Sequence, residues 1–357
     1  MHIFPALYKV YNVLVPNLLN IPRSDFGFGI PSRLRALLIY QVSKSYGCPY
    51  CVAHCATIGS VPSGPNLYLA DMPHTDNLDS DRWSPADRAA LRFAAAVATS
   101  PSRNITPEIL ADLRHHFSPH QVHLVFLAPA LMGFLNSVMN TLGPPLEPIS
   151  LLQAQQHLES TGWSPGKHRI ADEELAATKT QLSERRTKLQ RAAGLAQLAK
   201  DVVGTVRAEA EWLKDVPVSM ATLAKYMEER WGFWPSYIGE LSSPQAARAI
   251  CYGLLEMFEC DGDAVHARLK HSVAYAMACS AENARLAVHF GYTAVRHGAA
   301  LETLRAAAVG EEVGAPGSVE DLAFRFARVY GTPRASEKSM AEELADGGLS
   351  PSDVVNL

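Results

Sequence analysis

Apolar residues recur at intervals of three and four along almost the whole of this 357-residue chain. That interval is the spacing of one face of an α-helix, and no segment shows the strict alternation of a half-buried strand. Hydrophobic residues make up 48% of the chain, and its length is enough for a large core and two domains of common size. The sequence therefore predicts an all-α fold built from more than one helical unit.

Local signals place the helices of the first half. Residues 32–46 form a broad apolar surface, and a second helix is expected to begin near Cys48, after Gly47, with Pro49 in its first turn. The SPAD sequence at Ser84 offers an N-cap, a first-turn proline and an acidic residue. Two further helices are expected in TPEILADLRHHF and SPHQVHLVFLAPALMGFLNSVMNTLG, before GPPLEP at 143–148 ends the unit.

Charge and composition argue against several classes of partner. The net charge of −4 and the pI of about 6.4 give no support for nucleic-acid binding. No stretch reaches the roughly 18 apolar residues that are needed to span a bilayer. The N-terminus lacks a basic region and a cleavage site, so no signal peptide is expected. These features favour a cytoplasmic protein with no membrane partner, in which the six cysteines are thiols or ligands rather than a structural disulfide framework.

The segment GCPYCVAHCATIG, residues 47–59, holds three cysteines and a histidine within eight positions. On a helix, Cys48, Cys51 and Cys55 share one face, and His54 can approach Cys51. Cys48 lies at the helix N-terminus, where unpaired N–H groups and the macrodipole favour a thiolate. Cysteines four positions apart have Cβ atoms about 5–6 Å apart, against about 3.8 Å in a disulfide. Cys48 and Cys51 are therefore the pair expected to oxidise.

Two other interpretations of this cluster stay open. Free cysteines are often small buried core residues. The four side chains also offer metal donors, but one helix cannot arrange four ligands tetrahedrally around zinc. A second ligand cluster would be needed, and its candidates, His115, His116, His120 and His123, include no cysteine. The favoured expectation is a catalytic group of Cys48, Cys51, His54 and Cys55, with neither a metal ion nor a cofactor.

The second half of the chain looks like a degenerate copy of the first. Segments 222–238, 269–291, 318–336 and 341–357 align in order with 6–19, 35–59, 84–102 and 108–124. We therefore expect repeats at 1–150 and 216–357, joined by a charged helical linker at 151–215. Leu175, Leu182 and Leu189 recur at heptad spacing in the linker. An amphipathic helix packed on its own domain is favoured there over a coiled coil.

The first half resembles the AhpD-like, carboxymuconolactone decarboxylase superfamily over roughly residues 30–148. The matching features are RALLIYQVSKSYG, CPYCVAHC, ATIG, SPADRAALRFAAAVA, TPEILADLRHHFSPHQVHLV and FLNSVMNTLGPPLE. The resemblance implies an all-α, usually oligomeric protein and a peroxidase or disulfide reductase activity. It also implies that Cys51 is the attacking thiol and Cys48 the resolving thiol.

The sequence departs from that family at two positions. Cys55 stands where the family commonly has its proton-relay histidine, and Ala36 stands where it has a glutamate. No Asp or Glu occurs between Asp25 and Asp71. A carboxylate from the second copy is one expected substitute, and the candidates are Glu256, Glu259 and Glu282.

The second copy has lost the cysteine motif. Cys279, Glu282, Arg285 and Leu286 align with Cys48, Cys51, His54 and Cys55. His289 and His297 lie on a helix assigned to structure. This half is expected to act as the partner of the active half, so that the chain is an intramolecular pseudo-dimer or a homo-oligomer.

Three functions follow from these observations. The favoured one is a thiol-dependent oxidoreductase that reduces a peroxide or a disulfide and is recycled by a thiol reductant protein. The second is a lyase or tailoring enzyme that binds a small organic substrate in an apolar pocket lined by HLVFLAPALMGFL, residues 123–135. The third is a non-catalytic binding or scaffold protein.

Overall fold

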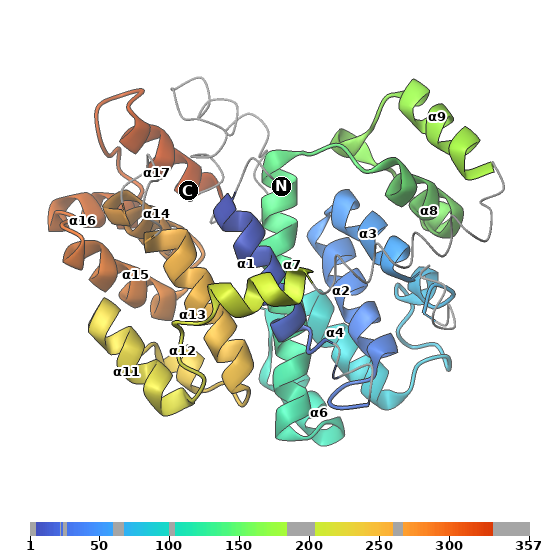
Figure 1. The fold of residues 1–357 in the computed structure, drawn as a ribbon, viewed down its shortest axis with the longest axis horizontal. Coiled ribbons are helices and arrows are strands. Elements are labelled where there is room, and N and C mark those ends of the chain that lie inside the picture. Colours follow the sequence, from blue (N-terminus) through green and yellow to red (C-terminus); the bar gives the residue numbers. More distant parts are fainter. Residues whose placement is uncertain are drawn as a thin grey trace. The chain divides into compact units, whose positions relative to one another are not determined.

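The computed structural model describes residues 5–21, 23, 27–59, 68–99, 104–183, 204–259 and 267–330. Helices dominate these residues and no strand occurs among them (Figure 1), which confirms the all-α fold. The chain divides into two compact units. We call Leu18–Lys214 the N-terminal unit, and Met1–Asn17 together with Asp215–Leu357 the C-terminal unit.

The N-terminal unit is built from α-helices, and residues 204–212 near its end are helical as well. Its α-helices include α2 (Ser32–Tyr46), α3 (Pro49–Gly59), α4 (Pro85–Thr99), α6 (Pro107–His116), α7 (Pro119–Leu142), α8 (Pro148–Leu158) and α9 (Asp172–Ser183). Short 3-10 helices accompany them, among them η2 (Met72–His74), η3 (Glu159–Thr161) and η4 (Gly166–His168).

The expected helix starts are confirmed, and their caps explain them. Ser84 Oγ accepts a hydrogen bond from the backbone N–H of Asp87 at 3.1 Å, at the start of α4. Ser118 and Gln121 form a complete capping box at the start of α7. Gly47 ends α2 with a φ of +79°, a conformation that glycine adopts without steric cost. These local signals fix the register of the helices that surround the cysteine motif.

Helix α2 lies at the centre of the N-terminal unit, where it packs against α3, α4 and α7. Its residues Leu37, Leu38, Tyr40 and Val42 are buried. At the start of α2, Arg33 binds the buried Asp71 carboxylate, with its Nε 2.8 Å from Oδ2. Arg82 donates to the other oxygen of Asp71 at 2.7 Å. The segment after α3 is thereby tied to both α2 and the loop before α4.

Helix α7 corrects one expectation from the sequence. It is long and apolar enough to cross a membrane by length and composition, whereas no such stretch was expected. Half of its most apolar window is buried inside the protein, where α7 packs against α2, α3, α4 and α6. Asn136 and Asn140 are buried on this helix. These features are typical of a core helix.

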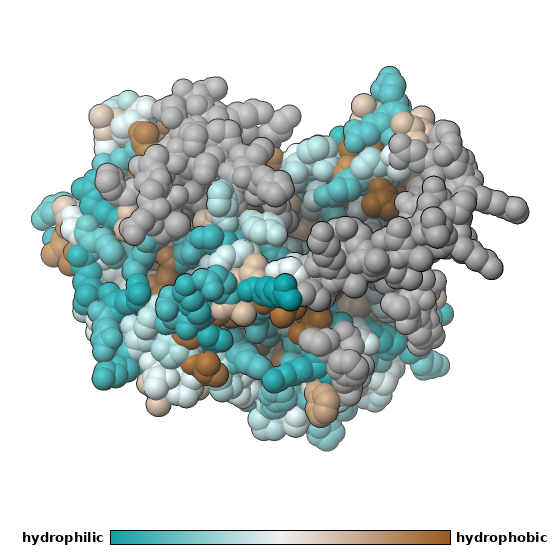
Figure 2. Space-filling model, viewed as in Figure 1, coloured by the Kyte–Doolittle hydropathy of each residue, from teal (hydrophilic) through white to brown (hydrophobic). Residues whose placement is uncertain are grey.

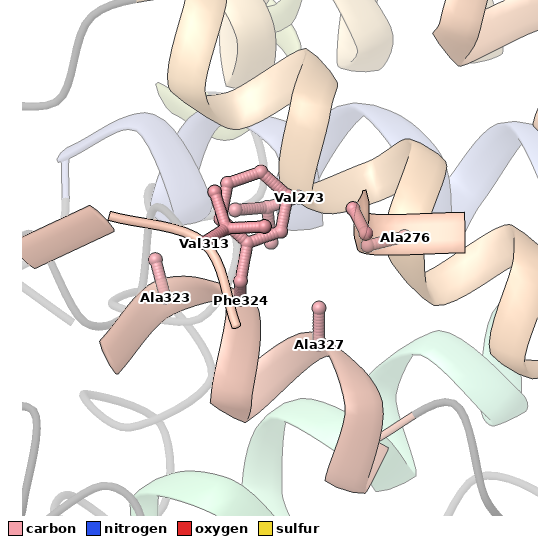
Figure 3. Close-up of a cluster of buried hydrophobic side chains, with 7 residues drawn as sticks. Val273, Ala276, Val313, Ala323, Phe324 and Ala327 are labelled. Carbon is pink, nitrogen blue, oxygen red and sulfur yellow. The ribbon is translucent and has the colours of Figure 1, made fainter. Parts of the chain in front are cut away.

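The C-terminal unit contains α1 (Pro5–Leu18), α11 (Met220–Trp231), α12 (Ser236–Gly239), α13 (Pro244–Glu259), α14 (Ala267–Ser280), α15 (Ala284–Arg296), α16 (Leu301–Val309) and α17 (Val319–Tyr330). Helix α14 packs against α13, α15, α16 and α17. In the core cluster of Figure 3, the ring of Phe324 from α17 points toward Val273 of α14 and Val313.

Helix α1 belongs to the C-terminal unit, which departs from the boundary expected after residue 150. Helix α1 packs against α13 at Gly253. A Cβ atom added at Gly253 would lie 3.6 Å from side-chain atoms of both Val10 and Leu14. Lys9 Nζ lies 2.6 Å from the Glu256 carboxylate. A glycine at the contact lets the two helix backbones approach closely.

The expected duplication stays a prediction. Helices α2, α3 and α4 correspond in the alignment to α14, α15 and α17, and in both units the first of the three packs on the other two. The last aligned segment, 341–357, lies outside the described residues, as does Leu189 of the expected heptads.

Hydrophilic residues predominate on the face shown in Figure 2, and the hydrophobic residues visible there form small separate patches. Single exposed apolar residues are normal on a protein surface.

Candidate functional site

Three of the four predicted site residues lie on α3, and the fourth, Cys48, is its N-cap. The backbone carbonyl of Cys48 accepts the first intrahelical hydrogen bond, from Val52 N–H at 3.1 Å. Its own N–H donates to Ser43 O at 3.0 Å, so the residue also closes the end of α2. The turn at Gly47 thus places the Cys48 side chain beside the unpaired N–H groups of α3.

Cys48 and Cys51 meet in the reduced form. Their Sγ atoms lie 2.9 Å apart and share a hydrogen bond, against a separation of about 2.05 Å in a disulfide. The backbone N–H of Cys51 also donates to Cys48 Sγ, at 3.3 Å. Cys48 Sγ therefore accepts in the manner of a serine oxygen at an N-cap.

The two thiols differ in acidity. The pKa of Cys48 is lowered, first by the hydrogen bond from Cys51, against an opposing desolvation effect, and further by backbone N–H groups and the Lys167 charge. The pKa of Cys51 is raised, because its proton is held in the bond to Cys48 and the site is desolvated. This arrangement favours a thiolate at Cys48, stabilised by a protonated Cys51.

Cys55 lies one turn after Cys51 and is buried. Burial raises the pKa of its thiol to about 12, although Ser43 offers a hydrogen bond that lowers it. Cys55 is therefore a neutral thiol at physiological pH. Cys55 lies on the expected helix, but the pKa of its thiol is raised, whereas the pKa of Cys48 is lowered.

His54 is paired with Glu147, the N-cap residue of α8. His54 Nε2 lies 2.9 Å from Glu147 Oε2, and Tyr50 Oη donates to Glu147 Oε1 at 2.8 Å. The rings of Tyr50 and His54 are 4.5 Å apart between centroids. Within the described residues, these contacts direct His54 toward a carboxylate and an aromatic ring rather than toward a cysteine sulfur.

Glu147 is the site residue that sequence reasoning missed. The carboxylate was expected from Glu256, Glu259 or Glu282, but His54 has its acidic partner within the N-terminal unit. Glu256 pairs with Lys9, and Glu259 accepts a hydrogen bond from Trp231. One signal was available: Glu147 is the only acidic residue in the sequence between Asp112 and Glu159.

The segment that follows Glu147 was assigned to a linker, yet it packs against the cysteine helix. Helix α8 contacts α3, and Trp163 Nε1 donates to Pro49 O at 3.1 Å. His168 is buried; its Nδ1 lies 2.7 Å from Pro144 O, and its carbonyl accepts from Leu146 N–H at 2.9 Å. These bonds hold the loop that carries Glu147.

Lys167 connects this segment to the start of α3. Its Nζ donates to Asn140 O, and Asn140 Nδ2 lies 3.4 Å from Gly47 O. The positive charge of Lys167 lowers the pKa of Cys48. The segment therefore contributes charge as well as packing to the cysteine pair.

The aligned positions of the C-terminal unit carry different contacts. Arg285 pairs with Glu240 at 3.2 Å on the surface, and Glu282 has a φ of +55°. A hollow of about 580 Å³ lies beside Arg285 and His289, lined by residues 232–237 and by α15. The pocket expected along residues 123–135 stays a prediction.

Comparisons with protein-family models, curated proteins and solved structures found no match to this chain. The fold and the geometry of the site therefore carry the functional argument.

Titration of Glu147 tests the geometry around His54. Desolvation raises the pKa of Glu147, but hydrogen bonds from His54, the backbone and Tyr50 outweigh it and hold the pKa at about 2. Because the folded pKa lies below the ordinary value, the carboxylate stabilises the fold above about pH 4.5, and this contribution is lost as the pH falls toward 2. With half of the side chain exposed, solvent screening limits the contribution to about 1 kcal/mol or less.

The measurement is an NMR titration of the side-chain carboxyl groups, with Glu147→Gln used to assign the signal. Unfolding by urea at several pH values then compares the two proteins. A Glu147 pKa near its ordinary value, or equal stability differences at all pH values, would contradict the pairing with His54.

Proposed function

We propose that this protein is a thiol-dependent oxidoreductase of the AhpD-like type, which reduces small disulfides or peroxides through Cys48 and Cys51. The observation that carries the proposal is the 2.9 Å hydrogen-bonded contact between the two Sγ atoms at a helix N-terminus. Both atoms needed for a disulfide are already adjacent. Formation of the bond from the Cys48 thiolate and the Cys51 thiol requires removal of one proton and two electrons and a small approach of the two sulfurs.

Access favours Cys51 as the residue that meets the substrate. Cys51 is 5% exposed, whereas Cys48 is 0% exposed. The resemblance to the AhpD-like family implies the same assignment. Before the attack, Cys51 passes its proton to the Cys48 thiolate along the hydrogen bond that joins them, and the Cys51 thiolate becomes the nucleophile.

The proposed reaction balances in two steps. The Cys51 thiolate attacks one sulfur of the substrate disulfide, forms a mixed disulfide and releases the other half as a thiolate, which takes the proton from Cys48. The Cys48 thiolate then attacks Cys51 Sγ and releases the second half, which is protonated by solvent. The products are two substrate thiols and the Cys48–Cys51 disulfide.

A hydroperoxide follows the same balance. Attack of Cys51 on an oxygen gives an alcohol and a sulfenic acid on Cys51. Attack of Cys48 on that sulfur then releases water. An external dithiol reductant returns the protein to its reduced form in both cases.

His54 and Glu147 are positioning residues in this proposal. Together with Tyr50 they fasten the first turns of α3 to the loop before α8. The same loop is anchored to η4, which carries Lys167. Their effect reaches the sulfurs through the placement of α3.

A single-turnover reaction tests the proposal. The reduced protein is mixed with a chromogenic aromatic disulfide under denaturant-free conditions, and released aromatic thiol is measured. We expect a fast phase that releases two thiols per chain and leaves no aromatic adduct, because Cys48 displaces the second half. Release of one thiol with a persistent adduct, or no fast phase, would contradict the proposed pair.

A further inference from the structure

A second cluster of chemistry-bearing side chains lies in the C-terminal unit, independent of the cysteine pair. Glu259 is the last residue of α13, His271 lies in α14, and His297 follows the end of α15. One potential ligand atom from each residue lies within 4.8 Å of the other two. Two imidazoles and one carboxylate are a common ligand set for zinc and related metals.

The tautomer of His271 follows from its contact with Thr293. Thr293 Oγ1 lies 3.2 Å from both the His289 and Phe290 carbonyls, so its proton is directed to its own helix. It therefore accepts from His271 Nδ1, which is 2.8 Å away. His271 Nδ1 carries the proton, and Nε2 has a free lone pair.

That lone pair is buried. His271 is 0% exposed, and its Nε2 has no hydrogen-bond partner among the residues that the structure describes. An unpaired acceptor in such a place is costly unless something binds it.

The surroundings hold the ring of His271 in place. It stacks on His297 with centroids 4.7 Å apart at 11°, and on Phe258 at 4.8 Å. Thr293 lies in the last turn of α15, and His297 is the C-cap of that helix, with its backbone N–H donating to Thr293 O at 3.0 Å. The residue that orients His271 and the second imidazole are therefore presented by one helix.

Glu259 supplies the carboxylate. Its Oε1 accepts a hydrogen bond from Trp231 Nε1 and lies 3.9 Å from His297 Nε2. Ligand atoms around a four-coordinate zinc are about 3.3 Å apart, given bonds of about 2.0–2.1 Å. Glu259 and His297 lie at helix ends and are 21% and 33% exposed, so their side chains have room to close around an ion.

We propose that Glu259, His271 and His297 bind one divalent transition-metal ion of the zinc class. His271 binds the ion through Nε2, and Thr293 Oγ1 accepts a hydrogen bond from its Nδ1–H. Metal-bound histidines are commonly oriented by such a hydrogen bond from the other ring nitrogen. Trp231 orients the Glu259 carboxylate through its Nε1–H hydrogen bond to Oε1. Three protein ligands leave a fourth position for water, on the side where Glu259 and His297 reach solvent.

Zinc titration of the full chain tests the proposal. Because thiols also bind zinc, the reference protein carries Cys48→Ser and Cys51→Ser, and it is first stripped with a chelator. Competition with a chromophoric chelator is expected to show one tight site per chain. Addition of Co²⁺ is expected to give the visible absorption of a four- or five-coordinate ion.

Ligand variants in that background locate the site. His297→Asn and Glu259→Gln, which change partly exposed side chains, are each expected to weaken zinc binding by more than about 100-fold. Thr293→Val keeps all three ligands and is expected to weaken it by about 10- to 100-fold. His116→Gln removes a surface histidine beside Asp112 in the N-terminal unit and serves as the matched control, with unchanged affinity.

Binding weaker than about 100 µM in the reference protein would overturn the proposal. So would tight binding that His297→Asn and Glu259→Gln leave unchanged. Circular dichroism of each variant establishes that it is folded before its affinity is compared.

Discussion

Replacing Cys51 with serine is expected to lower the turnover of a small disulfide or hydroperoxide by at least about a thousandfold. The substitution removes the sulfur that is proposed to attack, and a serine hydroxyl is not ionised at physiological pH. It also removes one half of the disulfide on which recycling depends. Turnover is measured in the steady state with an excess of a dithiol reductant, by disulfide or hydroperoxide consumption.

Cys251→Ala is the matched control for this substitution. Cys251 is a buried thiol in the C-terminal unit, and burial raises its pKa to about 12. Its removal is expected to leave turnover nearly unchanged. If Cys51→Ser retained more than about a tenth of the rate, the assignment of the nucleophile would be wrong.

Truncation of Phe324 to alanine is expected to reduce the free energy of unfolding of the C-terminal unit by about 3–5 kcal/mol. Phe324 is 1% exposed and fills the space between α14 and α17. Its neighbours in the cluster are mostly alanine and valine, whose short side chains cannot fill the space that the ring leaves. Urea unfolding followed by tryptophan fluorescence measures the loss.

Phe28→Ala removes the same atoms from a side chain that is 69% exposed, and it is expected to change stability by less than about 0.5 kcal/mol. Phe324→Leu retains part of the buried side-chain volume, and its loss in the free energy of unfolding is expected to lie between those of Phe324→Ala and Phe28→Ala. Equal losses for Phe324→Ala and Phe28→Ala would show that the cluster does not stabilise the unit.

The helices near the cysteine motif were predictable because their determinants are local. The turn glycine at 47, the N-cap at Ser84 and the capping box at Ser118 are all readable within a few residues. The position of Cys48 at the start of α3 follows from the same signals. Its low pKa relative to Cys51 was partly predictable from the helix N-terminus.

The contacts that complete the site are not local. Glu147 reaches His54 from more than ninety positions away in the chain, and no spacing rule relates the two residues. The apolar face of α1 indicates that the helix packs against something, but the amphipathic pattern does not specify which unit. Gly253 of α13 contacts α1, and this role of the glycine is apparent only when the packing of the two helices is known.

The histidines of the C-terminal unit illustrate the same limit. A single histidine on a helix is most simply interpreted as structural, and His297 was interpreted so. Its neighbours Glu259 and His271 lie on two other helices. Only the packing of α13, α14 and α15 brings the three side chains together.

The most direct test of the account is to map the cysteines by mass spectrometry after mild oxidation, and to follow the alkylation of each against pH. We predict a single Cys48–Cys51 linkage that a dithiol reverses, and a thiol in this pair that is alkylated with an apparent pKa well below about 8.5. If oxidation leaves the two residues unlinked and all six cysteines behave as ordinary buried thiols, the central claim is contradicted.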